Sequence, residues 1–434
     1  MNWQKCAHLN KTSHRIVHVL CSVISKAYRV EYRKNIKIAY PIVLGHVGHM
    51  ITQLADTIMI GKLGDFPLAS VAFANAVFAL GLVFCIGLAT AVTTLVGQAH
   101  GENNDAKKSE ILGNSIFSYL VFSLLLMILG LATRPLLYFL GQDPLVVEGS
   151  IPYLTYLIFS IIPLMIFLSL KHFMDGIEWT KPSMYISLIA NLINVGLNYL
   201  LIYGKFGLPQ LGLEGAGMAT LFSRILMAVI AIILLFTHVK LAHYTLAFHR
   251  FKVSMITLKN IFKLGVPMGL QYLMEAGAFI LAAFFIGKLG ATSLAAHQIA
   301  MSIASFTYMF AMGISSVGTI RVSNLIGAKN LEQIPMVTKS WMVLILAIEV
   351  LFAAALLLGN EWIPTLFIDN EEVVYQASKL LVIAAIFQVV DGFQALAMAL
   401  LRGLSDVKKP TSIALISYWI ISIPVGYLLM TWAG

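Results

Sequence analysis

The sequence has little charge and few cysteines. Lys, Arg, Asp and Glu make up 11% of the 434 residues and hydrophobic residues make up 59%, whereas soluble domains carry about 25% charged residues. The three cysteines, Cys6, Cys21 and Cys85, do not make a disulfide framework. These shortages exclude an ordinary soluble domain and indicate an integral membrane protein.

Two motifs of nucleotide and metal chemistry are also absent. The chain has no G-x-x-x-x-G-K-[ST] phosphate-binding sequence, which argues against direct use of ATP. It has no H-E-x-x-H pair, and the histidines of its first apolar segment lack the spacing of a zinc site. We therefore expect no cofactor, and an intramembrane enzyme is a less favoured alternative.

Long apolar runs recur along nearly the whole chain and are separated by short polar loops. About 20 consecutive apolar residues cross a bilayer as a helix, and the period-2 alternation of a membrane β-barrel does not occur. We therefore predict an all-α integral membrane protein. Its eleven spans are expected near residues 36–60, 66–99, 111–132, 150–171, 183–203, 214–238, 258–286, 292–326, 334–358, 373–401 and 411–432.

The formal net charge of +9 is distributed unevenly over the loops. With a cytoplasmic N-terminus, the inner loops hold most of the basic residues, for example Lys107, Lys408 and Lys409, and the outer loops hold few. This bias follows the positive-inside rule. We therefore predict a multi-pass protein of the cytoplasmic (inner) membrane with its N-terminus in the cytoplasm, and no nucleic-acid partner.

The two halves of the chain repeat each other. The pentapeptide IGKLG occurs at 60–64 and at 286–290, and the same offset pairs residues 41–104 with 267–330, where 16 of the 64 pairs are identical. Six spans that repeat in the same orientation predict two pseudo-symmetric six-helix bundles, related by an axis along the membrane normal. Such parallel repeats are typical of alternating-access transporters, whose substrate site lies between the lobes.

The repeat also divides the chain into domains. Residues 1–34 are expected to form a cytoplasmic N-terminal extension, 35–238 the N-lobe, 239–257 a cytoplasmic linker and 258–434 the C-lobe. The C-lobe would contain spans seven to eleven. Symmetry predicts a twelfth span, which would follow the last residue given.

An aspartate, Asp391, lies in the middle of the tenth span. A charge at the bilayer centre costs roughly 2.5–3.5 kcal/mol, so this carboxylate needs a partner or a function. Gln388 and Gln394 follow the spacing i−3 and i+3 around Asp391, and we expect all three on one side of the helix. Phe387 lies one turn before the aspartate and is expected to line the same cavity.

A glutamate, Glu275, occupies the seventh span one turn after Gln271. Intramembrane carboxylates usually mark ion or substrate paths, although a structural ion pair or a buried neutral acid is the alternative. Together with amide oxygens, Glu275 and Asp391 are a candidate sodium site, or either acid takes up a proton. An organic cation would compete for the same charge, helped by cation–π contacts with aromatic neighbours.

Polar stripes mark the first and fifth spans. Gln53 and Asp56 follow two histidines along one face of the first span, and Asn194 and Asn198 occupy the fifth. These residues line a substrate cavity or, alternatively, form hydrogen bonds that lock helix packing.

Four further polar residues have weaker signals. His297 opens the eighth span, where it lines the cavity or simply packs. Glu349 is a mid-span acid with no polar companion one turn away, and its role stays unexplained. Arg321 and Arg402 lie near inner helix ends and are expected to snorkel towards water.

Several segments resemble the multidrug and toxic compound extrusion (MATE) family. They are AYPIVLGHVGHMITQLADTIMIGKLG (39–64), LNYLLIYGKFG (197–207), SLAAHQIA (293–300) and the LLRG and KKP elements of 400–410. The resemblance extends from about residue 35 to the end. It implies a V-shaped pair of six-helix bundles that exports cationic amphipathic drugs in exchange for sodium or protons.

The resemblance also implies roles for particular residues. Glu275 and Asp391 match the acids that bind the coupling cation in a bacterial branch of the family, and Asp56 matches its first-helix aspartate. Asn194 and Asn198 match its fifth-helix asparagines. One position departs, because Phe387 replaces a tyrosine that this branch often carries, and the loss of that oxygen favours protons over sodium.

These observations predict a secondary active multidrug efflux antiporter, not an enzyme. It would export small cationic amphipathic drugs in exchange for Na⁺ or H⁺ by alternating access, as a monomer in the lipid bilayer. The alternative is a flippase or exporter of a lipid-linked or other metabolite on a related fold. Such a cavity would be more basic than the acids and amides found here.

Overall fold

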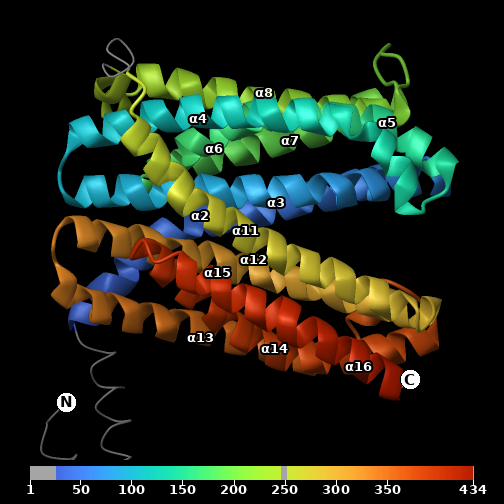
Figure 1. Cartoon of the computed structure of the whole chain (residues 1–434). Helices are drawn as coiled ribbons and strands as arrows, with labels where there is room; N and C mark the ends of the chain where they lie inside the picture. Colours follow the sequence, from blue (N-terminus) through green and yellow to red (C-terminus); the bar gives the residue numbers. More distant parts are fainter. Residues whose placement is uncertain (1–25, 246–251, 434) are drawn as a thin grey trace, which may run out of the picture.

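The computed structural model describes residues 26–245 and 252–433, and these are helical almost throughout (Figure 1). The first half forms α2 (Lys26–Gly61), α3 (Asp65–Gly101), α4 (Asp105–Ala132), η2 (Arg134–Leu140), α5 (Pro144–Phe159), α6 (Ile161–Gly176), α7 (Lys181–Tyr203) and α8 (Gly212–Thr237). The linker begins with α9 (Val239–Ala242) and η3 (His243–Thr245). The second half forms α11 (Met255–Gly287), α12 (Ala291–Gly327), η4 (Leu331–Gln333), α13 (Ile334–Gly359), η5 (Pro364–Leu366), α14 (Glu371–Gly403), α15 (Lys408–Ala414), the π-helical η6 (Leu415–Ser422) and α16 (Ile423–Ala433).

Side-chain caps fix where several helices start. Asn104 accepts a hydrogen bond from the backbone N–H of Lys107 (2.9 Å) and so caps α4. Asn370 does the same for Val373 at the start of α14 (3.1 Å). An asparagine oxygen at this position satisfies a backbone donor that has no partner inside the helix, so the polar loops end the apolar runs at defined residues.

The helices match the expected spans. Within the described residues, ten helical segments are long and apolar enough to cross a membrane, with α5 and α6 forming one span and Lys408–Trp432 another. The eleventh expected span is α2, which falls outside this set and carries the polar stripe described above. The predicted all-α membrane fold is therefore confirmed.

The helices form two groups, α2 to α8 and α11 to α16 (Figure 1). Helix α2 contacts both groups. Its first half packs Ile38 and Ile42 against Ile314 and Trp341 of α12 and α13, whereas near its other end Met59 accepts a hydrogen bond from Tyr203 of α7 (2.8 Å). The polar stripe of α2 therefore lies on a helix that both lobes hold.

A buried ion pair strengthens the attachment of α2 to the C-lobe. Arg321 on α12 contacts Glu31 (2.5 Å), and Asn35 donates a hydrogen bond to Ser340 on α13 (3.0 Å). The expectation that Arg321 snorkels to water is wrong, because its side chain is buried against a carboxylate. The boundary at residue 34 also moves, since residues 26–34 continue α2 without a break, while residues 1–25 lie outside the described part.

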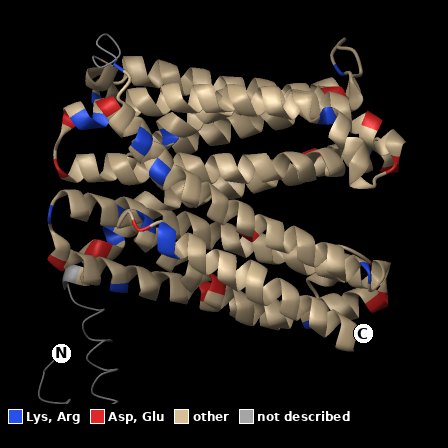
Figure 2. Cartoon of the chain, in the orientation of Figure 1, with Lys and Arg blue, Asp and Glu red and all other residues tan. Residues whose placement is uncertain are grey.

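Glycines bring the lobes together at one end. A Cβ at Gly101 of α3 would overlap the carbonyl oxygen of Asn324 on α12, and a Cβ at Gly327 would overlap that of Gln98. This end carries the turns 102–104 and 328–333 and most of the Lys and Arg residues (Figure 2). From this basic end the lobes diverge towards the opposite end (Figure 1).

Candidate functional site

The N-lobe encloses a cavity of about 470 Å³ between α2, α3 and α5 to α8. A cavity of this size suits a small organic molecule. Its polar and aromatic lining includes His46, His49, Gln53, Asp56, Asn75, Phe78, Tyr153, Lys171, Asn191, Asn194, Ser223 and Arg224. We call it the N-lobe cavity.

The predicted residues of the first and fifth spans meet in this cavity. Asn198 donates a hydrogen bond to Asp56, and it also donates to Asn194 (3.2 Å), which in turn donates to Ser223 on α8 (3.4 Å). Gln53 lines the cavity one turn from Asp56. The sequence therefore predicted this grouping, and the hydrogen bonds show that Asn198 also holds the carboxylate in place.

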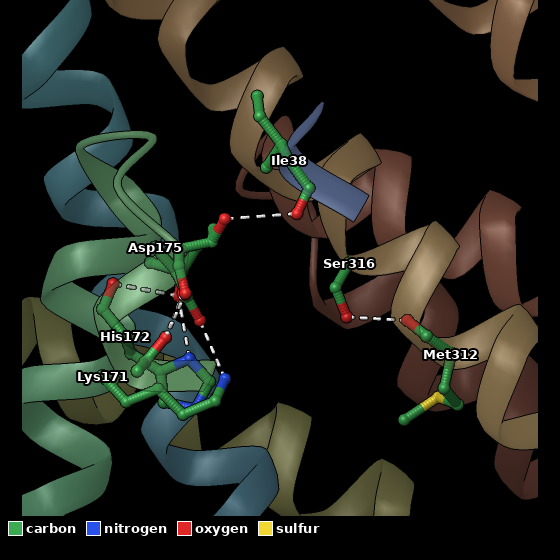
Figure 3. A network of polar contacts seen from close by, with 9 residues as sticks. Ile38, Lys171, His172, Asp175, Met312 and Ser316 are labelled. Carbon is green, nitrogen blue, oxygen red and sulfur yellow. Dashed lines mark hydrogen bonds and ion pairs between the residues drawn. The ribbon is translucent and has the colours of Figure 1, made fainter. Parts of the chain in front are cut away.

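Two basic side chains in the N-lobe cavity are absent from the sequence-based set. Arg224 donates to the hydroxyl of Ser160 (2.6 Å), and its guanidinium carbon lies 5.2 Å from the centre of the Phe78 ring. Lys171 forms an ion pair with Asp175 (2.8 Å), which Figure 3 shows beside His172. The expected cavity of acids and amides alone is therefore wrong for the N-lobe.

Glu275 lies in a small pocket of the C-lobe with a volume of about 10 Å³. The hydroxyl of Tyr308 donates a hydrogen bond to its carboxylate (2.9 Å). Gln271, which is 2% exposed, lines the same pocket. So does Ser316, whose hydroxyl donates to the carbonyl of Met312 (2.7 Å, Figure 3). This C-lobe pocket offers hydroxyl, amide and carboxylate oxygens in a small volume.

Arg402 also faces the C-lobe pocket, and the expectation that it snorkels is wrong. Its side chain is 8% exposed, donates to the hydroxyl of Tyr272 (2.9 Å) and stacks over that ring at 4.8 Å. A buried guanidinium here balances the negative charge of Glu275. Its position near a helix end suggested an interfacial role, but α14 turns that face towards α11.

Asp391 is buried on α14 close to Glu275. Its side chain is 8% exposed, and the charges of the two carboxylates act on each other and on Tyr308. The structure therefore brings together the two acids that the sequence singled out. In the described part of the chain, no group of three or more His, Cys, Asp or Glu residues is placed to hold a metal ion, so a sodium site would need neutral oxygens as well.

The two glutamines beside Asp391 do not share one face, contrary to the expectation. Gln388 accepts from Thr307 on α12 (2.9 Å) and donates to the carbonyl of Glu349 (3.2 Å), whereas Gln394 donates to Tyr418 on η6 (2.8 Å). Six residues advance a helix by 600°, which leaves the two side chains about 120° apart.

Two further predicted residues lie away from both cavities. Phe387 is 43% exposed and is absent from the lining of either cavity. His297 is half-buried in the first turns of α12 and likewise lines neither of them. Their assignment to a substrate cavity stays a prediction.

A third carboxyl, Glu349, lies next to the site. Its side chain is 2% exposed and packs against Gly392, where a Cβ would lie 2.6 Å from the Glu349 Cγ. One carboxyl oxygen, Oε1, is buried without a hydrogen-bond partner among the described residues. The charge of Asp391 acts on it. The sequence offered one signal for this contact, a glycine directly after Asp391.

We expect Glu349→Gln to weaken coupling without abolishing it. Removing a second negative charge near Asp391 lowers the attraction for a cation there, and we expect the affinity for the coupling ion to fall about 3- to 10-fold, or about 0.7–1.4 kcal/mol. The half-saturating Na⁺ or H⁺ concentration for dye efflux measures this. Glu361→Gln at an exposed glutamate is the control, and an unchanged ion dependence would separate Glu349 from the site.

Comparisons with known proteins agree with this arrangement. A model of the MatE family matches residues 41–200 and 267–428, which are the two halves of the repeat. "Multidrug resistance protein NorM" of Vibrio cholerae is 30% identical over 404 residues, covering 93% of this chain and 88% of the relative. "Probable multidrug resistance protein NorM" of Pseudomonas putida is 32% identical over 403 residues, covering 92% and 87%.

Solved structures share the fold. A multidrug resistance MATE family transporter in an outward-facing conformation superposes with a TM-score of 0.85 at 20% identity, covering 93% of this chain and 89% of that chain. A Vibrio cholerae MATE transporter mutant gives 0.85 at 18% identity, covering 94% and 96%. Two helical lobes with buried intramembrane carboxylates define a multi-pass membrane transporter rather than an enzyme. The chain belongs to the MatE family.

Proposed function

We propose that this transporter is a secondary active multidrug efflux antiporter. It exports cationic amphipathic compounds in exchange for Na⁺ or H⁺ by alternating access. The observation that carries the proposal is the placement of Glu275 and Asp391 together inside the C-lobe, buried and next to Tyr308. The names of the relatives, which are multidrug resistance proteins, support the substrate class.

The state of the lobes supports alternating access. Asn324 donates to Glu178 (2.8 Å) and Gln98 donates to Ser405 (2.8 Å), and both bonds cross between the lobes at the basic end. With a cytoplasmic N-terminus and inner membrane location, which we also propose, these contacts close the cytoplasmic side. The molecule would then be outward-facing, and it would act as a monomer.

The C-lobe pocket favours a proton over sodium as the coupling ion. A sodium ion needs several oxygen ligands around it, and the pocket of about 10 Å³ is barely the size of one water-sized probe. Phe387 supplies no oxygen where this branch of the family often has a tyrosine. A proton needs only one carboxyl oxygen, and Glu275 already has the hydrogen-bond partner that would orient it.

Efflux of a fluorescent cationic dye from cells without their own pumps tests the proposal. A sodium pulse and, separately, a pH step are applied to the parent chain and to Glu275→Gln. We expect efflux to follow the pH step and to fall about tenfold or more in the variant, since a charged hydrogen-bonding group contributes about 1.5–3 kcal/mol. Glu214→Gln at an exposed glutamate of α8 is the control. Absence of gradient-driven efflux in the parent chain would refute the function, and a response to sodium alone would reverse the choice of ion.

A further inference from the structure

Arg224 is a charged residue inside an apolar membrane span, α8, and it lines the N-lobe cavity. None of the ion pairs among the described residues includes it. Its contacts are a serine hydroxyl, Ser160, and the face of Phe78. A cation in a membrane span without a carboxylate partner is rare and usually functional.

The guanidinium retains capacity for a ligand. It carries five N–H donors in a planar fork, and Ser160 takes one of them through Nη1. A fork of this kind matches a carboxylate with two parallel hydrogen bonds. Phe78 lies against the guanidinium and would flank an aromatic ligand that approaches from the cavity.

The opposite charge lies in the same cavity. Asp56 is held by Asn198, one helical turn along α7 from Asn194, which bonds to Ser223, the neighbour of Arg224. Arg224 and Asp56 are therefore separated by one to two helical turns, or roughly 5–10 Å along the axis. The other basic group of the lining, Lys171, is neutralised by Asp175. One unpaired cation and one carboxylate thus remain.

We propose that the N-lobe cavity binds amphipathic zwitterions, with the ligand carboxylate on Arg224 and the ligand cation on Asp56. The inference rests on the proposed export function and narrows its substrate class. A ligand that carries only positive charge would leave Arg224 unpaired and would be repelled by it. A ligand of about 5–10 Å between its charged groups satisfies both ends, and the apolar walls bury its body.

Two dyes that differ in one ester test the inference. Rhodamine 110 carries a free carboxylate beside its cationic ring system, and rhodamine 123 is its methyl ester and only a cation. Binding to the purified full chain is measured by fluorescence polarisation, and export by proteoliposomes. For Arg224→Gln we expect rhodamine 110 affinity to fall about tenfold, a typical loss for a charge-assisted bond, while rhodamine 123 stays within about twofold or binds more tightly.

Further variants separate the explanations. Arg224→Lys keeps the charge and should retain most of the rhodamine 110 affinity, and Asp56→Asn should weaken both dyes. Equal loss of both dyes in Arg224→Gln would make Arg224 structural and overturn the inference, as would rhodamine 110 binding that the variant leaves unchanged. Binding of rhodamine 123 alone by the parent chain would overturn it and leave the export function standing. Failure to bind or export either dye would refute both.

Discussion

Gly327→Ala will separate the lobes at the basic end and slow transport. The added Cβ would overlap the carbonyl oxygen of Gln98, a backbone atom that cannot rotate away. Overpacking of this kind costs about 1–3 kcal/mol, which is roughly 5- to 150-fold in the equilibrium between closed and separated lobes. We expect dye efflux to slow by a comparable factor, because the closed state is populated less.

The accessibility of a cysteine at Ser405 measures the separation directly. Ser405 contacts Gln98 across the closed end, so Ser405→Cys should react with a membrane-impermeant thiol reagent faster when Gly327→Ala is present. The experiment uses inverted vesicles and a chain without its native cysteines. Gly196→Ala on α7 is the matched control, since a Cβ there meets nothing within 4 Å. Equal labelling and equal efflux in both variants would contradict this account.

The repeat in the sequence foretold that these glycines are equivalent, but not that they meet. Gly101 aligns with Gly327, and Gln98 aligns with Asn324, at the same offset. In the structure each glycine contacts the carbonyl of the other pair's polar residue across the pseudo-axis. A one-dimensional repeat identifies equivalent positions, whereas the faces that touch depend on helix rotation, which only packing fixes.

The spans and the principal acids could be predicted from the sequence because both are composition signals. A run of apolar residues needs no partner to be recognised as a span, and Asp391 is conspicuous because a charge there is costly. Arg224 and Glu349 carried the same signal but had no polar neighbours at helical spacing on their own helices. Their partners, Ser160 and Gly392, come from other helices, which the sequence does not pair.

The side-chain directions of arginines near helix ends were likewise hidden. Arg321 and Arg402 are both within two turns of the ends of α12 and α14, where snorkelling is the ordinary expectation. Each is instead buried because the opposite partner lies deeper in the bundle, Glu31 for Arg321 and Tyr272 for Arg402. Only a model of how α2 and α11 cross these helices places those partners.

Asp391→Asn is expected to abolish ion-driven export while leaving the protein inserted and able to bind dye. The amide keeps the size of the side chain but removes the charge that attracts a cation or proton. A hydrogen bond to a charged group contributes about 1.5–3 kcal/mol, which corresponds to roughly 10- to 100-fold in cation affinity. Uphill efflux driven by a pH step or a sodium pulse should therefore fall to background in proteoliposomes.

Coupling and translocation are distinguished by comparing uphill with downhill flux. If Asp391 carries the coupling ion, Asp391→Asn still lets dye move down its own gradient, because the N-lobe cavity and the closing glycines are intact. Asp391→Glu, which keeps the charge, should restore part of the uphill flux, and Asp369→Asn at an exposed aspartate before α14 should behave like the parent chain. Normal uphill export by Asp391→Asn would remove Asp391 from the coupling site, and the role would then fall to Glu275 with Tyr308, the other hydrogen-bonded acid of the C-lobe.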